Sequence, residues 1–415
     1  MHTIDKNNFE KTVLENGVTV ISEKIDSVRS IAIGVWVKSG SRVEKTSQSG
    51  TAHFLEHMIF KGTKKRSPLK IAQSLESLGG HLNAFTGKEV TCYFGNALDN
   101  HLKNAVEVLA DIVCHSTFPE KEIERERTVI LEEIKSTKDT PEDYVFDIFQ
   151  EKVFPKSSLG RPILGEEEII NNMQRDDVFS FWQKNYSGQN VIISAAGNLR
   201  HEKLLMLVEK YFDFNGNQTH NIKKSVKTAT GKTYYIDQPI SQAHLCMGGE
   251  SIPYMSEDRF PLMILNTYLG GGMSSRLFQQ IREKRGLAYS VYSFLDFYSD
   301  VGLFGIYAGT DPQNLDILQN VLKVELQRVV EEPIKKGVLN KIKNQLKGNL
   351  VLALESTSRR MSRLAKNEIY FGNYIGLDSL IERIDNVHES DVLAVAQKVI
   401  KPEDFITVTL CPKKQ

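Results

Sequence analysis

The same order of predicted strands and helices occurs twice in this 415-residue chain, and this recurrence restricts the fold more than any other feature. In the first half, Gly80–Ala84 precedes a predicted strand at Val90–Ala97. In the second half, Gly286–Tyr289 precedes a predicted strand at Gly302–Ala308. The distance from Gly80 to Gly286 is 206 residues, and few letters match, so the architecture repeats rather than the sequence. A half of about 200 residues is an ordinary domain size.

The sequence therefore predicts an α+β fold of two homologous halves, each a mainly antiparallel β-sheet backed by helices. The first half is expected to span residues 1–214 and the second residues 233–415. Between them, residues 215–232 are polar, basic and poor in large apolar side chains, which is typical of a linker or an extended crossing.

Composition excludes several classes of function. Lys+Arg and Asp+Glu both number 52, so nothing favours nucleic acid or a polyanionic partner. The four cysteines lie far apart without a C-x-x-C pair, which argues against a disulfide framework and favours a reducing compartment. The N-terminus has no apolar signal region, and no apolar run approaches the roughly 18 residues of a membrane span. We therefore expect a cytoplasmic protein that does not bind membranes.

The pentad His53-Phe54-Leu55-Glu56-His57 carries the chemistry. It follows Ser47–Gly50, which offers capping residues for a helix. On a helix, positions i and i+4 share one face and i+3 lies beside them. Both imidazoles can then bind one metal ion, with Glu56 close to the open coordination position, as a hydrolytic zinc site requires. The alternative is a helix whose histidines are ordinary surface or core residues.

A third ligand is sought among the acids of the predicted helix at residues 119–137. At about 100° per residue, Glu126 and Glu133 fall on an apolar face with three isoleucines, whereas Glu132 falls opposite. An inward carboxylate is costly unless it is paired or binds a metal. Glu133 is the better ligand candidate, and Glu126 could orient a histidine. The alternative, that both pair with a basic residue such as Arg127, is equally compatible with the periodicity.

These residues resemble the pitrilysin/insulinase family of inverted-motif zinc metallopeptidases, most closely bacterial relatives of the β subunit of mitochondrial processing peptidase. In that family the third ligand is a Glu about 76 residues beyond the second His, which is the spacing from His57 to Glu133. The family also keeps an acid seven residues earlier, which matches Glu126. The resemblance implies one Zn²⁺ per chain, held by His53, His57 and Glu133, with Glu56 as general base and Glu126 in a supporting catalytic role.

Other segments extend the resemblance over essentially the whole chain. Residues 79–86 resemble the family's substrate-binding edge strand, which implies that Asn83 and Ala84 bind substrate. Residues 269–278 resemble its glycine-rich segment. Arg282, near the end of a predicted helix at Leu277–Lys284, and Tyr289 resemble its Arg…Tyr pair. That pair is implied to bind the substrate backbone and stabilise the oxyanion. Taken from the residues alone, Arg282 could be a helix-end charge, Tyr289 a core residue and Asn83 a turn residue.

The resemblance further implies a clamshell of two domains around a chamber that admits short or unfolded peptides in extended conformation. The expected oligomeric state is a monomer or a homodimer. The predicted function is zinc-dependent endopeptidase activity. The main alternative is a non-catalytic partner subunit of the same fold in a processing-peptidase-like complex. Such subunits usually lose the ligands or the base, whereas this chain has His53, Glu56, His57 and Glu133. A purely structural zinc site would not need Glu56.

Overall fold

A computed structural model describes residues 8–214 and 226–413 of the chain. Two compact units emerge, and each has its own sheet and core. The first unit contains residues 8–135, 161–214 and 352–376. The second contains residues 136–160, 226–351 and 377–413. The predicted α+β fold with two mainly antiparallel sheets is confirmed, whereas the clamshell arrangement stays a prediction. Among the described residues, no helix is both long enough and apolar enough to span a bilayer.

The first unit is built around a six-stranded sheet in the order β1-β2-β6-β3-β5-β4. Its strands are β1 (Phe9–Val13), β2 (Thr19–Lys24), β3 (Ser30–Val37), β4 (His81–Thr86), β5 (Thr91–Leu98) and β6 (Val191–Gly197). Its helices are α1 (Thr51–Ile59), α2 (Pro68–Glu76), α3 (Leu102–His115), most of α4 (Glu120–Asp139), α6 (Glu167–Asn172), α7 (Arg175–Asn185), α8 (His201–Tyr211) and α12 (Thr357–Phe371).

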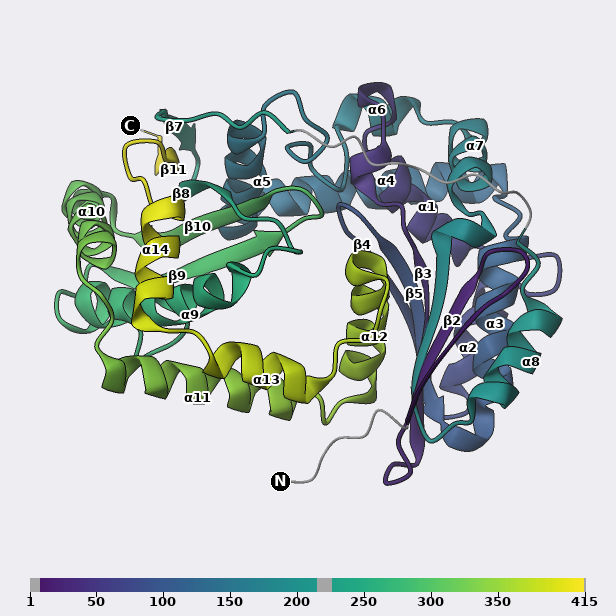
Figure 1. Cartoon of the computed structure of the whole chain (residues 1–415). Helices are drawn as coiled ribbons and strands as arrows, with labels where there is room; N and C mark the ends of the chain where they lie inside the picture. The colour runs from purple at the N-terminus through teal and green to yellow at the C-terminus, as the bar shows by residue number, and fades with distance from the viewer. Residues whose placement is uncertain (1–7, 215–225, 414–415) are drawn as a thin grey trace. The chain divides into compact units, whose positions relative to one another are not determined.

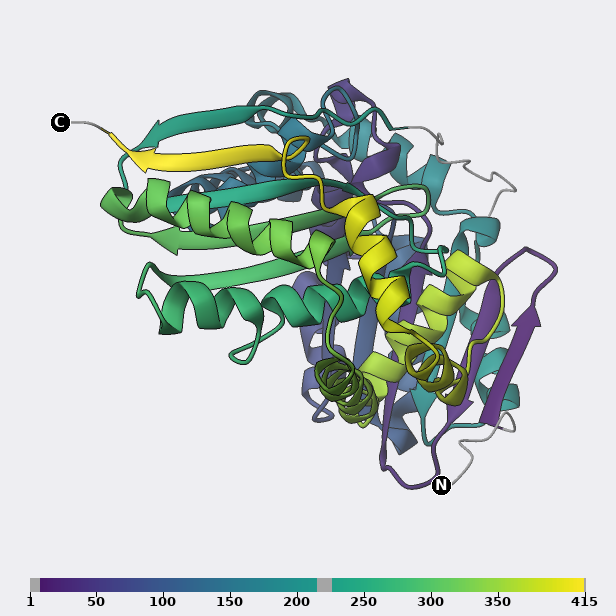
Figure 2. The same cartoon turned by 60° about the vertical axis from the view of Figure 1, so that its left-hand side comes forward.

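The second unit is built around a five-stranded sheet in the order β7-β11-β8-β10-β9. Its strands are β7 (Thr233–Gln238), β8 (Ala243–Ser251), β9 (Ala288–Phe297), β10 (Gly302–Thr310) and β11 (Ile406–Pro412). Its helices are α5 (Pro141–Val153), α9 (Arg259–Gly270), α10 (Leu315–Glu331), α11 (Lys336–Ala353), α13 (Leu377–Asp385) and α14 (Glu389–Val399). Figure 2 shows β11, in yellow, running parallel to β7, in teal, at one edge of this sheet.

The two sheets repeat one topology. In the first, β2 pairs with β6 in parallel, and the pairs β6–β3, β3–β5 and β5–β4 are antiparallel. In the second, β7 pairs with β11 in parallel, and the pairs β11–β8, β8–β10 and β10–β9 are antiparallel. The predicted repeat of architecture is therefore present, with β4 and β9 as corresponding edge strands.

Each sheet is covered on one face by a helix from the other half of the sequence. In the first unit, alternate residues such as Ile21 and Trp36 lie outside the main core and pack in one cluster with Met361 of α12. Figure 1 shows α12 beside the strands of this sheet. The Trp36 indole donates to Met361 Sδ at 3.2 Å, and Ser194 Oγ donates to the Met361 carbonyl at 2.7 Å. In the second unit, α5 covers the corresponding face, where Phe149 packs in one cluster with Tyr307.

This exchange of α5 and α12 differs from the predicted division into contiguous halves at residues 214 and 233. Each helix has an apolar face that another element must cover, and the complementary sheet face is built from the other half of the sequence, within the same compact unit. Residues 215–225 of the predicted linker lie outside the described residues. In its remainder, the Ala229 amide donates to the Val153 carbonyl at 2.9 Å, so this part packs against the second unit.

Candidate metal centre

Helix α1, which carries the pentad, begins differently from the sequence prediction. Its N-cap is Gly50, in the left-handed conformation at φ 90°, and no side chain at that position caps it. Instead the Glu44 carboxylate accepts the Gly50 amide at 3.0 Å and the Ala52 amide at 2.7 Å. The N-cap residue therefore lies in the predicted segment Ser47–Gly50, but the side chain that accepts the helix amides comes from Glu44, earlier in the chain. The second of these amides belongs to Ala52, the residue directly before His53.

The apolar side of α1 determines the direction in which the polar residues of the pentad point. Phe54, Leu55 and Met58 are fully buried in the main core of the first unit. Because these residues anchor one side of a helix, His53, Glu56 and His57 are left on the other, partly exposed side. The predicted arrangement of the pentad on one helix is therefore present.

The structure brings the three predicted ligands together. Glu133 Oε2 lies 3.7 Å from His53 Nε2 and 3.6 Å from His57 Nε2, and all three ligand atoms lie within 4.8 Å of one another. Ligands placed tetrahedrally at about 2.0–2.1 Å from zinc are separated by about 3.3–3.4 Å. The donor set and its spacing therefore fit one metal ion. Within residues 8–214 and 226–413, this is the one group of three such side chains.

The protonation of His53 suits a metal ligand. Burial, reinforced by the neighbouring His57, lowers the pKa of His53 to about 3. The imidazole is therefore neutral near pH 7, the form that binds a metal. Its Nδ1 is buried and makes no hydrogen bond with the described residues, so Nε2 is the nitrogen that faces Glu133.

Glu126 contacts His57 at Nδ1, the ring nitrogen that does not face Glu133. Its carboxylate lies 3.0 Å from His57 Nδ1 and 2.7 Å from Lys61 Nζ, and the residue is 5% exposed. Burial raises the pKa of this carboxyl, but the hydrogen bonds from His57 and Lys61 outweigh burial and bring the pKa below its usual value. A carboxylate on the far nitrogen of a metal-binding imidazole fixes the ring and its tautomer. The alternative pairing with Arg127 is not found, because Arg127 pairs with Glu124.

Glu126→Gln is expected to weaken metal binding or activity by roughly 10- to 100-fold, because the remaining amide is a poorer acceptor for the His57 ring. The measurement is the zinc Kd by competition with a chromophoric chelator, together with kcat/KM. Glu124→Gln, on the exposed side of the same helix, is the matched control and should behave as wild type. Equal zinc affinity and activity in both variants would contradict this role.

Glu133 lies at the rim of the site rather than inside the core. Its side chain is 41% exposed, whereas that of Glu132 is 66% exposed and pairs with Lys135 at 2.6 Å. Of the two acids, the helical wheel chose the one that lies beside the two histidines, but it predicted a buried carboxylate for Glu133. The cost of burying a charge applies instead to Glu126, one of the four buried residues of α4.

Glu56 is positioned by the neighbouring edge strand. Thr86 Oγ1, at the end of β4, donates to Glu56 Oε2 at 2.5 Å. Burial raises the pKa of the Glu56 carboxyl above 4.5, against the opposing effects of the Thr86 hydrogen bond and of His57. A carboxyl with a raised pKa beside a metal cluster is a stronger base than a free one.

The predicted substrate strand is an edge of the sheet. β4 pairs with β5 on one side and is the last strand of the order. Asn83 is exposed, and its Oδ1 accepts the Ala84 amide at 2.8 Å, so a side chain already engages an amide of this strand. Asn83 lies within β4, so the alternative that it is a turn residue is wrong.

Arg282 and Tyr289 lie together in the second unit. The predicted helix around Arg282 is a π-helix at Phe278–Glu283. The guanidinium stacks over the rings of Phe278 and Tyr289, 4.7 and 4.6 Å from their centroids, and Nη1 donates to the Tyr289 carbonyl at 3.0 Å. Tyr289 is 75% exposed, so it is not a core residue. In the nearby glycine-rich segment, Met273 is also strongly exposed.

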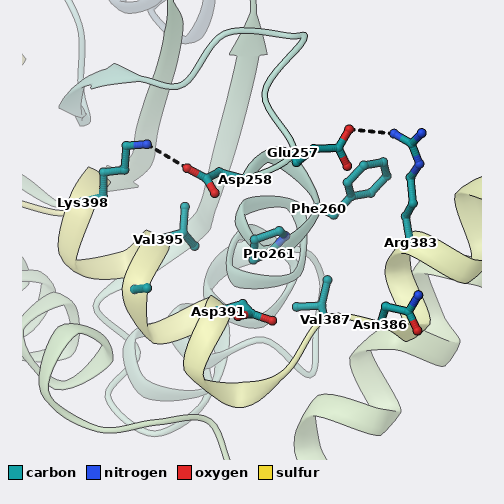
Figure 3. A pocket seen from close by; sticks show the side chains of 11 residues that line it. Glu257, Asp258, Phe260, Pro261, Arg383, Asn386, Val387, Asp391, Val395 and Lys398 are labelled. Atoms are coloured by element: carbon teal, nitrogen blue, oxygen red, sulfur yellow. Dashed lines mark hydrogen bonds and ion pairs between the residues drawn. The ribbon is translucent and has the colours of Figure 1, made fainter.

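A cavity of about 460 Å³ lies elsewhere, in the second unit between α9, α13 and α14 (Figure 3). Its charges already pair at the rim, Arg383 with Glu257 and Lys398 with Asp258, both at 2.7 Å. Asp391 accepts the backbone amide of His388 within the capping box of α14. These pairings account for the charged side chains of the cavity without a ligand, so the group of His53, His57 and Glu133 is the stronger candidate for the functional site.

Sequence reasoning missed Glu44, Lys61 and Thr86. Thr86 lies in the segment identified as the edge strand, and Lys61 is one turn beyond His57. Both could have been considered from their positions. For Glu44 no local pattern existed, because it caps α1 from outside the helix.

Comparison with known proteins agrees with this geometry. Residues 19–167 match the family model described as insulinase (peptidase family M16), and residues 172–346 match that of the peptidase M16 inactive domain. The "Uncharacterized zinc protease YmxG" of Bacillus subtilis is 40% identical over 407 residues, which cover 97% of this chain and 98% of that protein. An "Uncharacterized zinc protease" of Streptomyces coelicolor is 39% identical over 407 residues, which cover 96% and 88%.

Solved structures are also similar. The crystal structure of a protease from Helicobacter pylori has a TM-score of 0.92 at 25% identity, and the match covers 97% of this chain and 99% of that chain. The structure of a peptidase M16 inactive domain from Pseudomonas fluorescens has a TM-score of 0.88 at 21% identity, covers 98% and 99%, and shows a shared fold alone.

Proposed function

Because the chain belongs to the insulinase family of peptidases, family M16, we propose that it is a zinc-dependent endopeptidase acting on short or unfolded peptides. The names of its zinc-protease relatives support the metal and the reaction class. The observation that carries the proposal is the grouping of His53, His57 and Glu133, with Glu56 on the same helix as both histidines. All four cysteines are free thiols, which supports action in the cytoplasm.

The chain's own residues divide the work of hydrolysis. Bound zinc would supply Lewis acidity, which lowers the pKa of water toward about 7 and polarises a carbonyl. His53, His57 and Glu133 would hold the ion, and Glu126 would keep His57 in the correct tautomer. Glu56 accepts the proton of the attacking water and returns it to the leaving amine, so the peptide bond is cleaved with no net change at the carboxylate.

The free edge of β4 is the proposed substrate-binding site. An extended peptide can add as a further strand through main-chain hydrogen bonds, which favours unfolded substrates. Asn83 and Ala84 would contact its backbone. The Asn83 side chain must then release the Ala84 amide, because its Oδ1 accepts from that group in the free protein. We further propose that the chain acts as a monomer or a homodimer.

The Arg282–Tyr289 pair is proposed to bind the substrate backbone and the developing oxyanion. Tyr289→Phe removes one hydroxyl and is expected to lower kcat/KM by roughly 10²-fold, the usual loss for one oxyanion donor. The measurement is steady-state cleavage of a quenched-fluorescent peptide. Tyr235→Phe, at an exposed position of β7, is the control. An unaltered kcat/KM in Tyr289→Phe would show that this hydroxyl is not used.

The proposed function is tested with the full chain loaded with one equivalent of zinc. We expect cleavage of some unfolded peptides from a diverse quenched-fluorescent library and no cleavage of the same sequences within a folded protein. A chelator should abolish turnover, and added zinc should restore it. Zinc binding without turnover of any peptide would favour the alternative, a non-catalytic partner subunit of the same fold.

A further inference from the structure

The short contact between Glu56 and Thr86 joins the proposed base to the proposed substrate strand. Thr86 is the last residue of β4, and its hydroxyl lies 2.5 Å from Glu56 Oε2. Alternate residues of a strand share a face, so Thr86 and Ala84 face the same side of the sheet. Both are half-buried. The strand and the helix that carries Glu56 also contact each other.

The backbone that follows Thr86 is held by hydrogen bonds to residues 41 and 42. After Thr86, the carbonyls of Gly87 and Lys88 accept the amides of Ser41 and Arg42 at 3.1 and 2.7 Å. A Cβ on Gly40 would lie 2.2 Å from the Gly87 carbonyl oxygen, so only glycine permits this close approach.

A buried ion pair connects the same two segments, residues 41–42 and 87–89. Arg42 Nη1 lies 2.5 Å from Glu89 Oε1, and the two side chains are 2% and 4% exposed. Lys88 Nζ donates to the Arg161 carbonyl at 2.5 Å, and Arg161 donates to the Glu44 carbonyl at 2.5 Å. The Glu44 carboxylate caps α1. The end of β4 and the start of α1 are thus connected through a series of buried and part-buried hydrogen bonds.

The orientation of Glu56 is the property that this arrangement controls. A Glu side chain has three rotatable bonds, and a general base acts only when its carboxylate is within hydrogen-bond reach of the water. The Thr86 hydroxyl engages Oε2 in a charge-assisted bond, and Oε1 is left to accept the proton. A rigid donor from a neighbouring element therefore selects one carboxylate orientation in advance.

We propose that Thr86 is a positioning residue, whose hydroxyl holds the Glu56 carboxylate in its reactive orientation and links the seat of the peptide to the base. This inference rests on the proposed function. Thr86 acts through Glu56 and makes no bond to the scissile group. A peptide that adds to β4 is then placed by the same strand that orients the Glu56 carboxylate, so one element sets the position of the substrate relative to the base.

The test compares Thr86→Val, which keeps the shape but removes the hydroxyl, with Thr86→Ser, which keeps the hydroxyl. For zinc-loaded Thr86→Val we expect kcat to fall roughly 10- to 100-fold, as for the loss of one charge-assisted hydrogen bond. KM and the zinc Kd should stay within about twofold of wild type, and Thr86→Ser should restore most of kcat. Thr409→Val, buried in β11 with a hydroxyl that has no partner among the described residues, is the matched control.

A double-mutant cycle isolates the route of action. In a Glu56→Gln background, Thr86→Val should cause no further loss, because the group it orients is already gone. The proposal would be overturned if Thr86→Val lowered kcat further in the Glu56→Gln background. It would also be overturned if Thr86→Val alone had a normal kcat, whether or not its KM were raised. In each case, cleavage by the wild type would still support the proposed function. Independently of activity, a crystal structure of the zinc-loaded wild type should show the Thr86–Glu56 bond, and a separation beyond hydrogen-bond distance would also overturn the proposal. Wild-type protein that cleaves no peptide would refute the proposed function itself, and this inference with it.

Discussion

Replacing Glu56 by Gln is expected to lower kcat on an unfolded peptide by roughly 10²- to 10⁴-fold, the usual contribution of a general base. Gln keeps the size of the side chain and can still accept a hydrogen bond from Thr86, but it cannot take a proton. Because Glu56 is not among the three ligand residues, zinc content and KM should remain close to those of wild type. The measurements are steady-state kinetics and metal analysis of the same preparation. Full activity in this variant would exclude Glu56 as the base.

The pH profile provides a second view of the same residue. Burial raises the pKa of Glu56 above 4.5, so its basic form is reached only at higher pH than for an exposed carboxyl. The acidic limb of wild-type kcat/KM is therefore expected above pH 4.5, with activity rising as the carboxyl loses its proton. In Glu56→Gln this limb should disappear from the residual activity. An identical limb in both proteins would assign it to another group.

Replacing Glu133 by Gln is expected to weaken zinc binding by roughly 10²- to 10⁴-fold and to abolish activity at limiting zinc. Structural zinc sites in small peptides bind with about 10–16 kcal/mol, and on that scale an equal share for one of three protein ligands is about 3–5 kcal/mol. The neutral amide lacks the charge that lies 3.7 and 3.6 Å from the two imidazole nitrogens. Zinc affinity by chelator competition and the zinc-induced rise in Tm are the measurements.

Glu132→Gln is the matched control for this prediction. It makes the same chemical change one residue away on the same helix, at a side chain that pairs with Lys135 in solvent. The two variants carry the same change on the same helix, but Glu133 points toward the two histidines and Glu132 points toward Lys135. If both bind zinc equally well, or if Glu132→Gln is the weaker binder, the ligand set is wrong.

The elements that the sequence predicted best are those in which local pattern and function coincide. The spacing of His53, Glu56 and His57 defines one helical face, and the apolar residues between them require that helix to bury its other side. The periodicity around Ile130 separated Glu126 and Glu133 from Glu132. It could not set the depth of burial, because depth depends on the neighbouring helix α1 rather than on α4 itself.

What the sequence could not supply depends on contacts between distant segments. The amphipathic pattern of α12 shows that it buries one face, but not that the partner is Trp36 on the sheet of the first unit. Likewise, Gly50 needs an acceptor for its amide, and no local rule selects Glu44 over the serines beside it. The π-helix that ends near Arg282 has the letters of an ordinary α-helix.

The reciprocal placement of α5 and α12 affects how this protein is made in the cell. Trp36 contacts Met361, 325 residues later, so one face of the first sheet cannot close until nearly the whole polypeptide has left the ribosome. Pairings of such long sequence separation slow folding, and apolar surface exposed meanwhile invites aggregation. Nascent chains therefore pass through a stage in which Ile21, Trp36 and Ile192 lie uncovered, and a chaperone that shields this face during synthesis would serve this fold better than one that acts after release.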